Sequence, residues 1–194
     1  MGRAWPVLIL LGFCQFCASW GSLAIIAVQV EMRDGLGVSA DDVAALVWAF
    51  SFSLAIGAPL AQAIIGHWDR KAVLFSSLSL LGFGAIALGF AQSWEQAMAA
   101  RVAMALGAAS VMPTASVIAA SLVSEAQRPA AMSVVFGGLT ASLVIALPIS
   151  SAVGEAMGWR AAWFVAAGAA FVAAAGVLIG APGGVRGARA SLGA

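Results

Sequence analysis

Charge is scarce in this chain of 194 residues, which holds nine Lys or Arg and eight Asp or Glu residues for a net charge of +1. Soluble domains usually carry about a quarter of their residues as charges. Here 63% of the residues are hydrophobic and the mean hydropathy is +1.04, which excludes a water-soluble fold. The charge balance also gives no basic field to collect phosphates, so nucleic acid is excluded as a partner.

The residue types that build most catalytic and metal sites are equally rare. The chain has one histidine, two cysteines, and no tyrosine or asparagine. One histidine and two cysteines are too few for a metal cluster or a disulfide framework, so we expect no metal and no cofactor. There is no Gly-rich phosphate loop, and no GxSG-like serine turn with a histidine on another span. The sequence therefore does not predict an enzyme.

Long apolar runs make up most of the chain. A helix that crosses about 30 Å of hydrocarbon needs about 20 apolar residues. Charged and turn residues divide the sequence into six such runs, at about 6–30, 42–65, 72–91, 97–122, 130–153 and 160–181. The sequence predicts an all-α, multi-pass membrane protein in contact with lipid, with one six-helix domain over residues 1–182 and a disordered tail over 183–194.

Two of the boundaries between these runs carry signals for a helix start. The charged segment 31–35 is expected to separate the first run from the second. Ser39 followed by Asp42 has the form of a capping box that opens the second helix, and Ser93 with Gln96 repeats the pattern before the fourth.

The loop charges predict an orientation. If both termini lie on one side, the loops on that side hold six basic and two acidic residues, whereas the opposite loops hold three basic and six acidic residues. Because basic residues collect on the cytoplasmic side of membrane proteins, we expect both termini in the cytoplasm.

Five short motifs stand in order at the helix boundaries. They are Gly57 to Leu74 between spans two and three, Arg101 to Gly107 with Pro113 in span four, Ser124 to Arg128 before span five, Gly137 to Pro148 within span five, and Gly158 to Arg160 before span six. Together they resemble the N-terminal half of the major facilitator superfamily, most closely its drug and sugar efflux branch. The resemblance implies a secondary transporter of the inner (plasma) membrane that works by alternating access. Such a transporter does not draw its energy from a bound nucleotide.

Members of that family resemble two six-helix halves with the substrate between them. Because six is an even number, two copies of this chain would share one orientation, and a homodimer could rebuild the twelve-helix arrangement. The alternative is a non-transporting remnant, a fragment or a membrane interaction partner that keeps the half-fold. The resemblance implies a dimer interface between spans two and five, and its expected residues are Gly57, Ala58, Gly138, Ala141, Ser142 and Pro148.

The loop after span two departs from the family pattern. The resemblance predicts a cytoplasmic gating loop at Asp69, Arg70 and Lys71. When the pattern is set in register on the basic pair, its acid falls on Gly66, and Asp69 takes the place of a turn glycine. No acid lies well inside a span, and Glu31 is the nearest candidate for a proton carrier. We therefore expect weak proton coupling or none.

Several polar residues inside the spans are candidates for solute binding. In span one, Gln15, Ser19 and Ser22 share one helix face, with Trp20 beside them, and in span five Thr140 lies on a similar stripe. Such stripes line aqueous cavities, although they also pack helices together. Arg101 near the outer end of span four either faces the cavity or extends to the headgroups. A cavity-facing Arg101 would favour anionic or strongly polarised small solutes.

Overall fold

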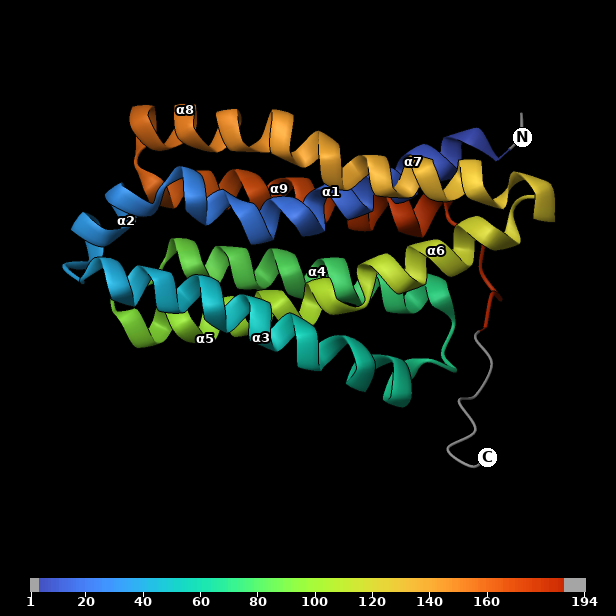
Figure 1. Ribbon diagram of the computed structural model, residues 1–194, viewed down its shortest axis with the longest axis horizontal. Helices are drawn as coiled ribbons and strands as arrows, with labels where there is room; N and C mark the ends of the chain where they lie inside the picture. Colours follow the sequence, from blue (N-terminus) through green and yellow to red (C-terminus); the bar gives the residue numbers. More distant parts are fainter. Residues whose placement is uncertain (1–3, 187–194) are drawn as a thin grey trace.

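The computed structural model describes residues 4–186, and six apolar helical spans run side by side along the molecule (Figure 1). This arrangement confirms the predicted all-α membrane fold. The spans are α1 (Trp5–Ala27), α3 (Ala40–Ile65), α4 (Arg70–Gly89), α5 with α6 (Trp94–Ala109 and Val111–Ser121), η1 with α7, η2 and α8 (Glu125–Gln127, Arg128–Ala141, Ser142–Ala146 and Leu147–Met157), and α9 (Trp159–Gly180). Helix α1 begins and α9 ends at the same end of the bundle.

The connection between the first two spans differs from the expected break. Helix α1 ends at Ala27, and a separate short helix, α2 (Gln29–Leu36), contains the charged segment 31–35. The charged segment therefore separates the first span from the second, as expected, but does so as a short helix. Gly37 ends α2 in the left-handed region at φ 65°, which glycine adopts without steric cost. The turn into α3 is therefore shorter than the charge pattern suggested.

The two expected capping boxes have different outcomes. The Ser39 N–H donates to Asp42 Oδ2 at 2.9 Å and the Asp42 N–H donates to Ser39 Oγ at 3.1 Å, so the box at α3 is complete. At α5, the Gln96 N–H donates to Ser93 Oγ at 3.4 Å, but the Gln96 side chain accepts from the Gln92 N–H instead of the cap residue. Only half of the second box forms.

Spans four and five are interrupted near their prolines. Helix α5 ends at Ala109 and α6 begins at Val111. Ala109 lies four residues before Pro113, which has no N–H to donate to the Ala109 carbonyl as a regular helix would. In span five a π-helical turn, Ser142–Ala146, precedes Pro148. Both interruptions follow from the missing proline N–H, because the backbone must rearrange around the unpaired carbonyl.

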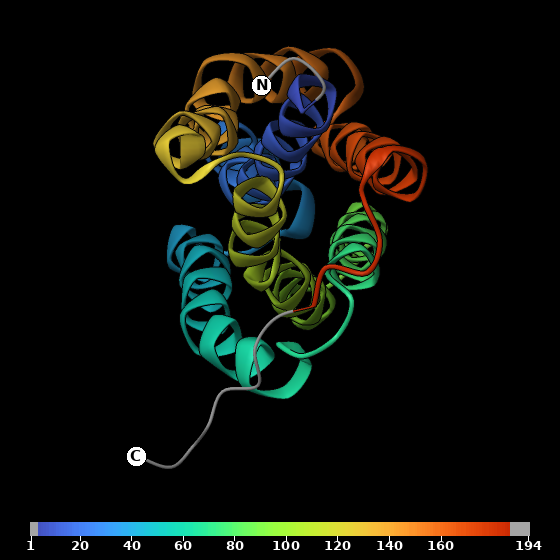
Figure 2. The ribbon, with the colours of Figure 1, turned by 90° about the vertical axis from the view of Figure 1, so that its right-hand side faces the viewer.

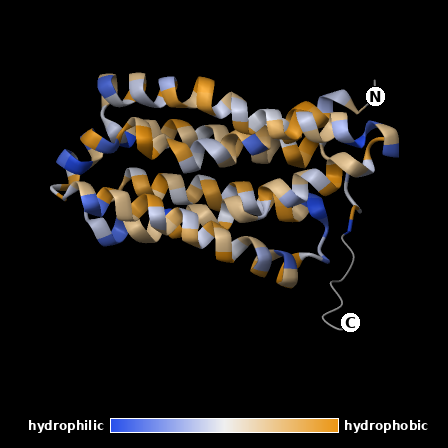
Figure 3. Ribbon diagram, in the orientation of Figure 1, coloured by the Kyte–Doolittle hydropathy of each residue, from blue (hydrophilic) through white to orange (hydrophobic). Residues whose placement is uncertain are grey.

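The six spans are buried to different degrees. In the most apolar window of each span, 61% of the residues are buried in α1 and in α5–α6, 56% in α4 and 44% in α9, but only 22% in α3 and 28% in α7–α8. The end-on view shows α3 and α7 at one side of the bundle, with α1 and α6 toward its middle (Figure 2). Hydrophilic residues gather mainly at the two ends of the bundle (Figure 3). The middle of the bundle therefore matches the apolar interior of a bilayer.

The chain after α9 returns to the loop between α3 and α4. The Gly184 N–H donates to Asp69 Oδ2, and the Arg70 N–H donates to the Val185 carbonyl at 2.9 Å. Residues 187–194, the greater part of the segment expected to be disordered, lie outside the described residues, and the disordered tail stays a prediction.

Candidate functional site

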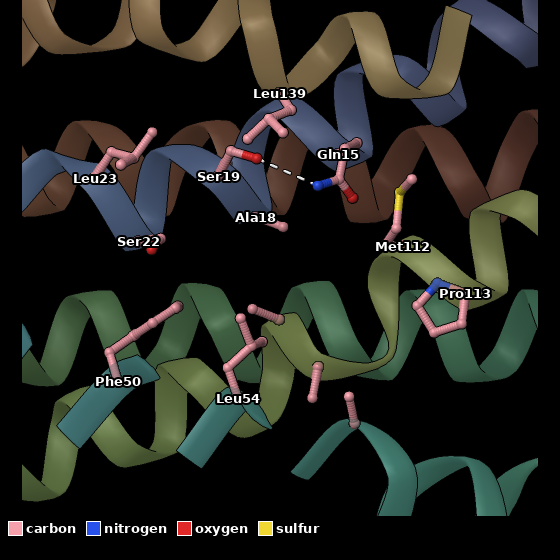
Figure 4. Close-up of a pocket in the computed structure, with 13 residues that line it drawn as sticks. Gln15, Ala18, Ser19, Ser22, Leu23, Phe50, Leu54, Met112, Pro113 and Leu139 are labelled. Carbon is pink, nitrogen blue, oxygen red and sulfur yellow. Dashed lines mark hydrogen bonds between the residues drawn. The ribbon is translucent and has the colours of Figure 1, made fainter. Parts of the chain in front are cut away.

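A pocket of about 320 Å³ lies between the flanking helices α3 and α7, against α1 and the α5–α6 junction (Figure 4). Its lining is Gln15, Ala18, Ser19, Ser22 and Leu23 from α1, Phe50, Leu54 and Ala58 from α3, Ala108 and Ala109 from α5, Met112 and Pro113 from α6, and Leu139 from α7. Residues from four of the spans thus meet around one cavity.

Three residues of the predicted polar stripe form one wall of this pocket. Gln15, Ser19 and Ser22 all line it, and the Gln15 Nε2 group donates to Ser19 Oγ at 3.3 Å (Figure 4). Their spacing in the sequence was a sufficient signal, because residues four and three apart share a helix face. Their role in solute binding stays a prediction.

Trp20 points away from the pocket. Its indole Nε1 donates to Ser150 Oγ at 2.7 Å, and its ring packs edge-on against Phe16 with centroids 5.5 Å apart. The side chain is buried between α1 and α8. The expectation that Trp20 faces a solute is therefore replaced by a packing role, which its position next to the stripe did not reveal.

Arg101 is completely buried and does not line the pocket. Its guanidinium donates from Nη1 to the Gly21 carbonyl at 2.7 Å, from Nη2 to the Ser22 carbonyl at 3.3 Å, and from Nε to the Leu46 carbonyl at 3.3 Å. It also lies 4.4 Å from the Phe50 ring centroid. Arg101 thus joins α1, α3 and α5 inside the bundle, which differs from both expected placements, the open cavity and the headgroups.

Thr140 is exposed on α7 and is absent from the pocket lining, where its neighbour Leu139 stands. Thr140 therefore does not join the wall formed by Gln15, Ser19 and Ser22, and its part in solute binding or in an interface stays a prediction. The apolar lining from α3 and α6, including Phe50, Leu54 and Met112, was missed altogether. In an apolar span these residues look like any lipid-facing or core residue, so no sequence pattern marks them.

Most of the small residues expected at a dimer interface are used inside the chain. Gly138 contacts the backbone of α1, where an added Cβ would overlap the Gly12 carbonyl oxygen. Gly57 is buried against Leu106, and Ser142 is buried within span five. The expectation of an interface through these three residues was wrong, because small residues also allow close packing within one bundle.

The remaining expected interface residues are more accessible. Ala58 lines the pocket, and Ala141 borders an apolar groove between α1 and α7. Pro148 is exposed on α8. Their part in an interface stays a prediction.

Asp69 caps α4 in place of the family's turn glycine. Its carboxylate accepts from the Lys71 N–H at 2.9 Å, from the Ala72 N–H at 3.3 Å, and from the Gly184 N–H. Partial burial opposes ionisation, but these donors and the charge of Arg186 hold the pKa of Asp69 below its usual value. The loop is therefore anchored as a negatively charged helix cap.

Arg70 beside it is buried, and its Nη1 donates to Gln62 Oε1 at 3.4 Å. The gating role of Asp69, Arg70 and Lys71 stays a prediction. Within residues 4–186, no group of three His, Cys, Asp or Glu side chains comes together in a way that could hold a metal ion.

The sequence matches proteins of known family over nearly its whole length. It is 29% identical to the uncharacterised MFS-type transporter YbcL of Bacillus subtilis over 82% of this chain and 41% of that protein. It is 32% identical to a chloramphenicol resistance protein of Streptomyces lividans over 92% of this chain and 46% of that protein. It is 26% identical to the purine ribonucleoside efflux pump NepI of Escherichia coli over 80% of this chain and 39% of that protein. The chain thus spans less than half the length of these relatives.

The fold has a counterpart among solved structures. A crystal structure of a peptide transporter, POT, in complex with alafosfalin superimposes with a TM-score of 0.75 at 17% sequence identity, over 89% of this chain and 37% of that one. At this identity the likeness concerns the fold alone. With six apolar spans and bacterial transporters as relatives, the chain is a multi-pass protein of the inner membrane. The sequence profile of the Major Facilitator Superfamily matches residues 9–192, and the chain therefore belongs to that superfamily.

Proposed function

We propose that this six-helix unit is one half of an alternating-access transporter, and that a second copy supplies the other half as a parallel, two-fold homodimer. The dimer would move a small solute down its gradient, and so outward when the solute is more concentrated inside the cell. The observation that carries the proposal is the pair of poorly buried spans, α3 and α7–α8, which flank the pocket. A second copy placed against these spans would close the pocket on its open side.

The exposed face of α3 is continuous and apolar. Five large side chains at intervals of four residues form a ridge along it, and each is 54–66% exposed. We call this set the α3 ridge, and it consists of Trp48, Phe52, Ile56, Leu60 and Ile64. A ridge of this length suits packing against the grooves of another helix.

The exposed face of span five offers a matching surface. Phe136, Thr140, Val144 and Pro148 are exposed at intervals of four residues, and we call them the span-five face. This face mixes large and small side chains, which would leave space for the α3 ridge of a partner. In a two-fold dimer each copy contributes one ridge and one face, so the contact would form twice.

The pocket favours a facilitator over a proton-coupled pump. No acidic side chain lines it, and Glu31 belongs to α2, away from the pocket. Proton coupling requires a group that gains and loses a proton as it meets each side of the membrane. We therefore propose that the solute gradient sets the direction of transport. Two of the relatives are named for chloramphenicol resistance and for purine ribonucleoside efflux, and these compounds are the first solutes to test.

Cysteine cross-linking in lipid tests the dimer. Cys14 and Cys17 are first replaced by serine, and Ile56→Cys is then combined with Thr140→Cys, which lies at a similar depth in the bundle. We expect a disulfide between chains. The matched control combines Ile56→Cys with Val172→Cys, an exposed residue on α9 at a comparable depth, and should give no cross-link between chains. Equal cross-linking of both pairs would indicate random collision, and no cross-linking of either would favour the non-transporting alternative.

Flux through proteoliposomes tests transport. Vesicles loaded with labelled chloramphenicol or a purine ribonucleoside should release at least one of them down its gradient faster than protein-free vesicles, and an imposed pH gradient should change the rate little. Accumulation against a solute gradient driven by the pH difference, retained in Glu31→Gln, would contradict the facilitator and require another proton carrier.

A further inference from the structure

We infer that the pocket selects an uncharged solute with an apolar body and at least one N–H or O–H donor. The inference rests on the proposed transport function, because it names the class of solute that the same pocket would carry. Three features of the pocket support it: no accessible charge, two oxygen acceptors that lack a regular partner, and an apolar lining everywhere else.

The pocket presents no charge to a solute. None of its thirteen lining residues is ionisable. The nearest cation, Arg101, lies behind Ser22 and Phe50, where three backbone carbonyls take its donors and no part of its side chain is exposed. An ionised solute would lose its hydration without gaining a counter-charge. The expectation of an anionic solute, which depended on a cavity-facing arginine, is therefore dropped.

The first acceptor is the side-chain oxygen of Gln15. The Gln15 amide nitrogen is bonded to Ser19, but its Oε1 atom is buried and has no hydrogen-bond partner. Leaving a buried carbonyl unpaired costs free energy, and a donor brought by a solute would recover it. A small rotation of the glutamine side chain, which lies at the pocket surface beside Met112, would bring this oxygen to the solute (Figure 4).

The second acceptor comes from the interruption of span four. Pro113 has no N–H, so the Ala109 carbonyl lacks the donor that a regular helix would provide four residues later. Both residues line the pocket. Gln15 on α1 and Ala109 on α5 lie on different walls of one cavity. The remaining lining is mainly aliphatic or aromatic, which suits the apolar body of the solute.

Binding of three matched probes to the protein in lipid nanodiscs tests this inference. 1-Naphthamide has N–H donors, N,N-dimethyl-1-naphthamide lacks them, and 1-naphthoate carries a negative charge on the same ring. We expect 1-naphthamide to bind at least about ten-fold more tightly than either of the others, because a pocket with unpaired acceptors rejects ligands without donors. Equilibrium dissociation constants are measured by ligand-observed NMR.

Variants separate hydrogen bonding from the size of the added methyl groups. In Gln15→Leu the two amides should bind within about two-fold of each other, and Pro113→Ala, which restores the N–H to Ala109, should reduce the preference in part. Val172→Ala, on α9 outside both the pocket and the proposed dimer contact, is the control and should keep the full preference. Retention of each variant's melting temperature in nanodiscs shows that the bundle is folded.

Several results would overturn the inference: tighter binding of 1-naphthoate, equal binding of the two amides to the native protein, a preference unchanged in Gln15→Leu, or no binding of any probe. These outcomes are independent of the cross-linking and flux results. A donor preference without a dimer would refute the proposed assembly alone, whereas a transporting dimer without the preference would refute the solute class alone.

Discussion

Spans one and four differ from spans two and five in how they use their apolar side chains. In α1 and α5–α6, 61% of the residues in the most apolar window are buried inside the bundle, while in α3 and α7–α8 the values are 22% and 28%. All four spans have similar hydropathy, between 1.7 and 2.1. Composition alone therefore does not distinguish a helix that holds the bundle together from one that flanks it.

The difference separates internal cohesion from outward contact. Spans one and four contribute the polar wall, the Arg101 bonds and the interrupted helix around the pocket. Spans two and five contribute the exposed α3 ridge and the span-five face. A substitution in the first pair should therefore damage folding, and a substitution on the outer surface of the second pair should damage association without unfolding the chain.

The largest effect is expected where span five contacts span one. Gly138→Leu would force a side chain into the α1 backbone at Gly12, which cannot move aside, and should destabilise the bundle by about 3 kcal/mol or more. The adjacent Gly137 has open space around it, so Gly137→Leu should fold normally. The yield and melting temperature of the two variants in detergent give the comparison. Equal tolerance of both would show that the two helices do not pack this closely.

Arg101 should have the next largest effect, as a structural residue. Arg101→Met removes three hydrogen bonds from a charged donor, and we expect a loss of about 2–4 kcal/mol in stability. Arg101→Lys should recover only part of it, because an ammonium group lacks the planar fork. Arg33→Met, at an exposed arginine paired with Asp34, is the control and should leave the melting temperature unchanged. Normal stability of Arg101→Met would mean that these bonds do not hold the bundle.

A third substitution addresses the α3 ridge. Ile56→Trp keeps an apolar surface, so a lipid-facing position would accept it, whereas a helix–helix interface would be forced apart. We expect the dimer dissociation constant in lipid to rise about ten-fold or more while the melting temperature of the bundle stays unchanged. Val172→Trp on α9 is the control. An unchanged dissociation constant for Ile56→Trp would assign the ridge to lipid.

The smallest effect concerns the Asp69 contact with Gly184. Because the pKa of Asp69 lies below its usual value of 3.8 in the folded chain, the carboxylate contributes stability above that value, and the contribution is lost as the pH falls through the lowered pKa. Hydrogen exchange at the Gly184 amide should therefore be unaffected between pH 7 and 5 once corrected for intrinsic rates. Asp69→Asn should accelerate it with little change in melting temperature. Equal protection in Asp69→Asn would mean that the carboxylate does not hold this segment.

The sequence was most informative where a pattern has one physical meaning. Six apolar runs could only be six spans, and the spacing of Gln15, Ser19 and Ser22 placed them on one wall of the pocket. It was least informative where one residue type serves two purposes. Gly138 suits contact within a chain as well as between chains, and the backbone partners of Arg101 leave no mark in the sequence. The apolar pocket wall from α3 could not be told from lipid-facing surface.

The number of chains per particle in lipid nanodiscs, measured by native mass spectrometry, tests the proposed assembly most directly. A homodimer built from spans two and five should give a protein mass of twice the 19.4 kDa of one chain, and Ile56→Trp should shift it toward a single chain. If the native protein and Ile56→Trp both have the mass of one chain in lipid, the dimer is contradicted and the pocket stays open on one side.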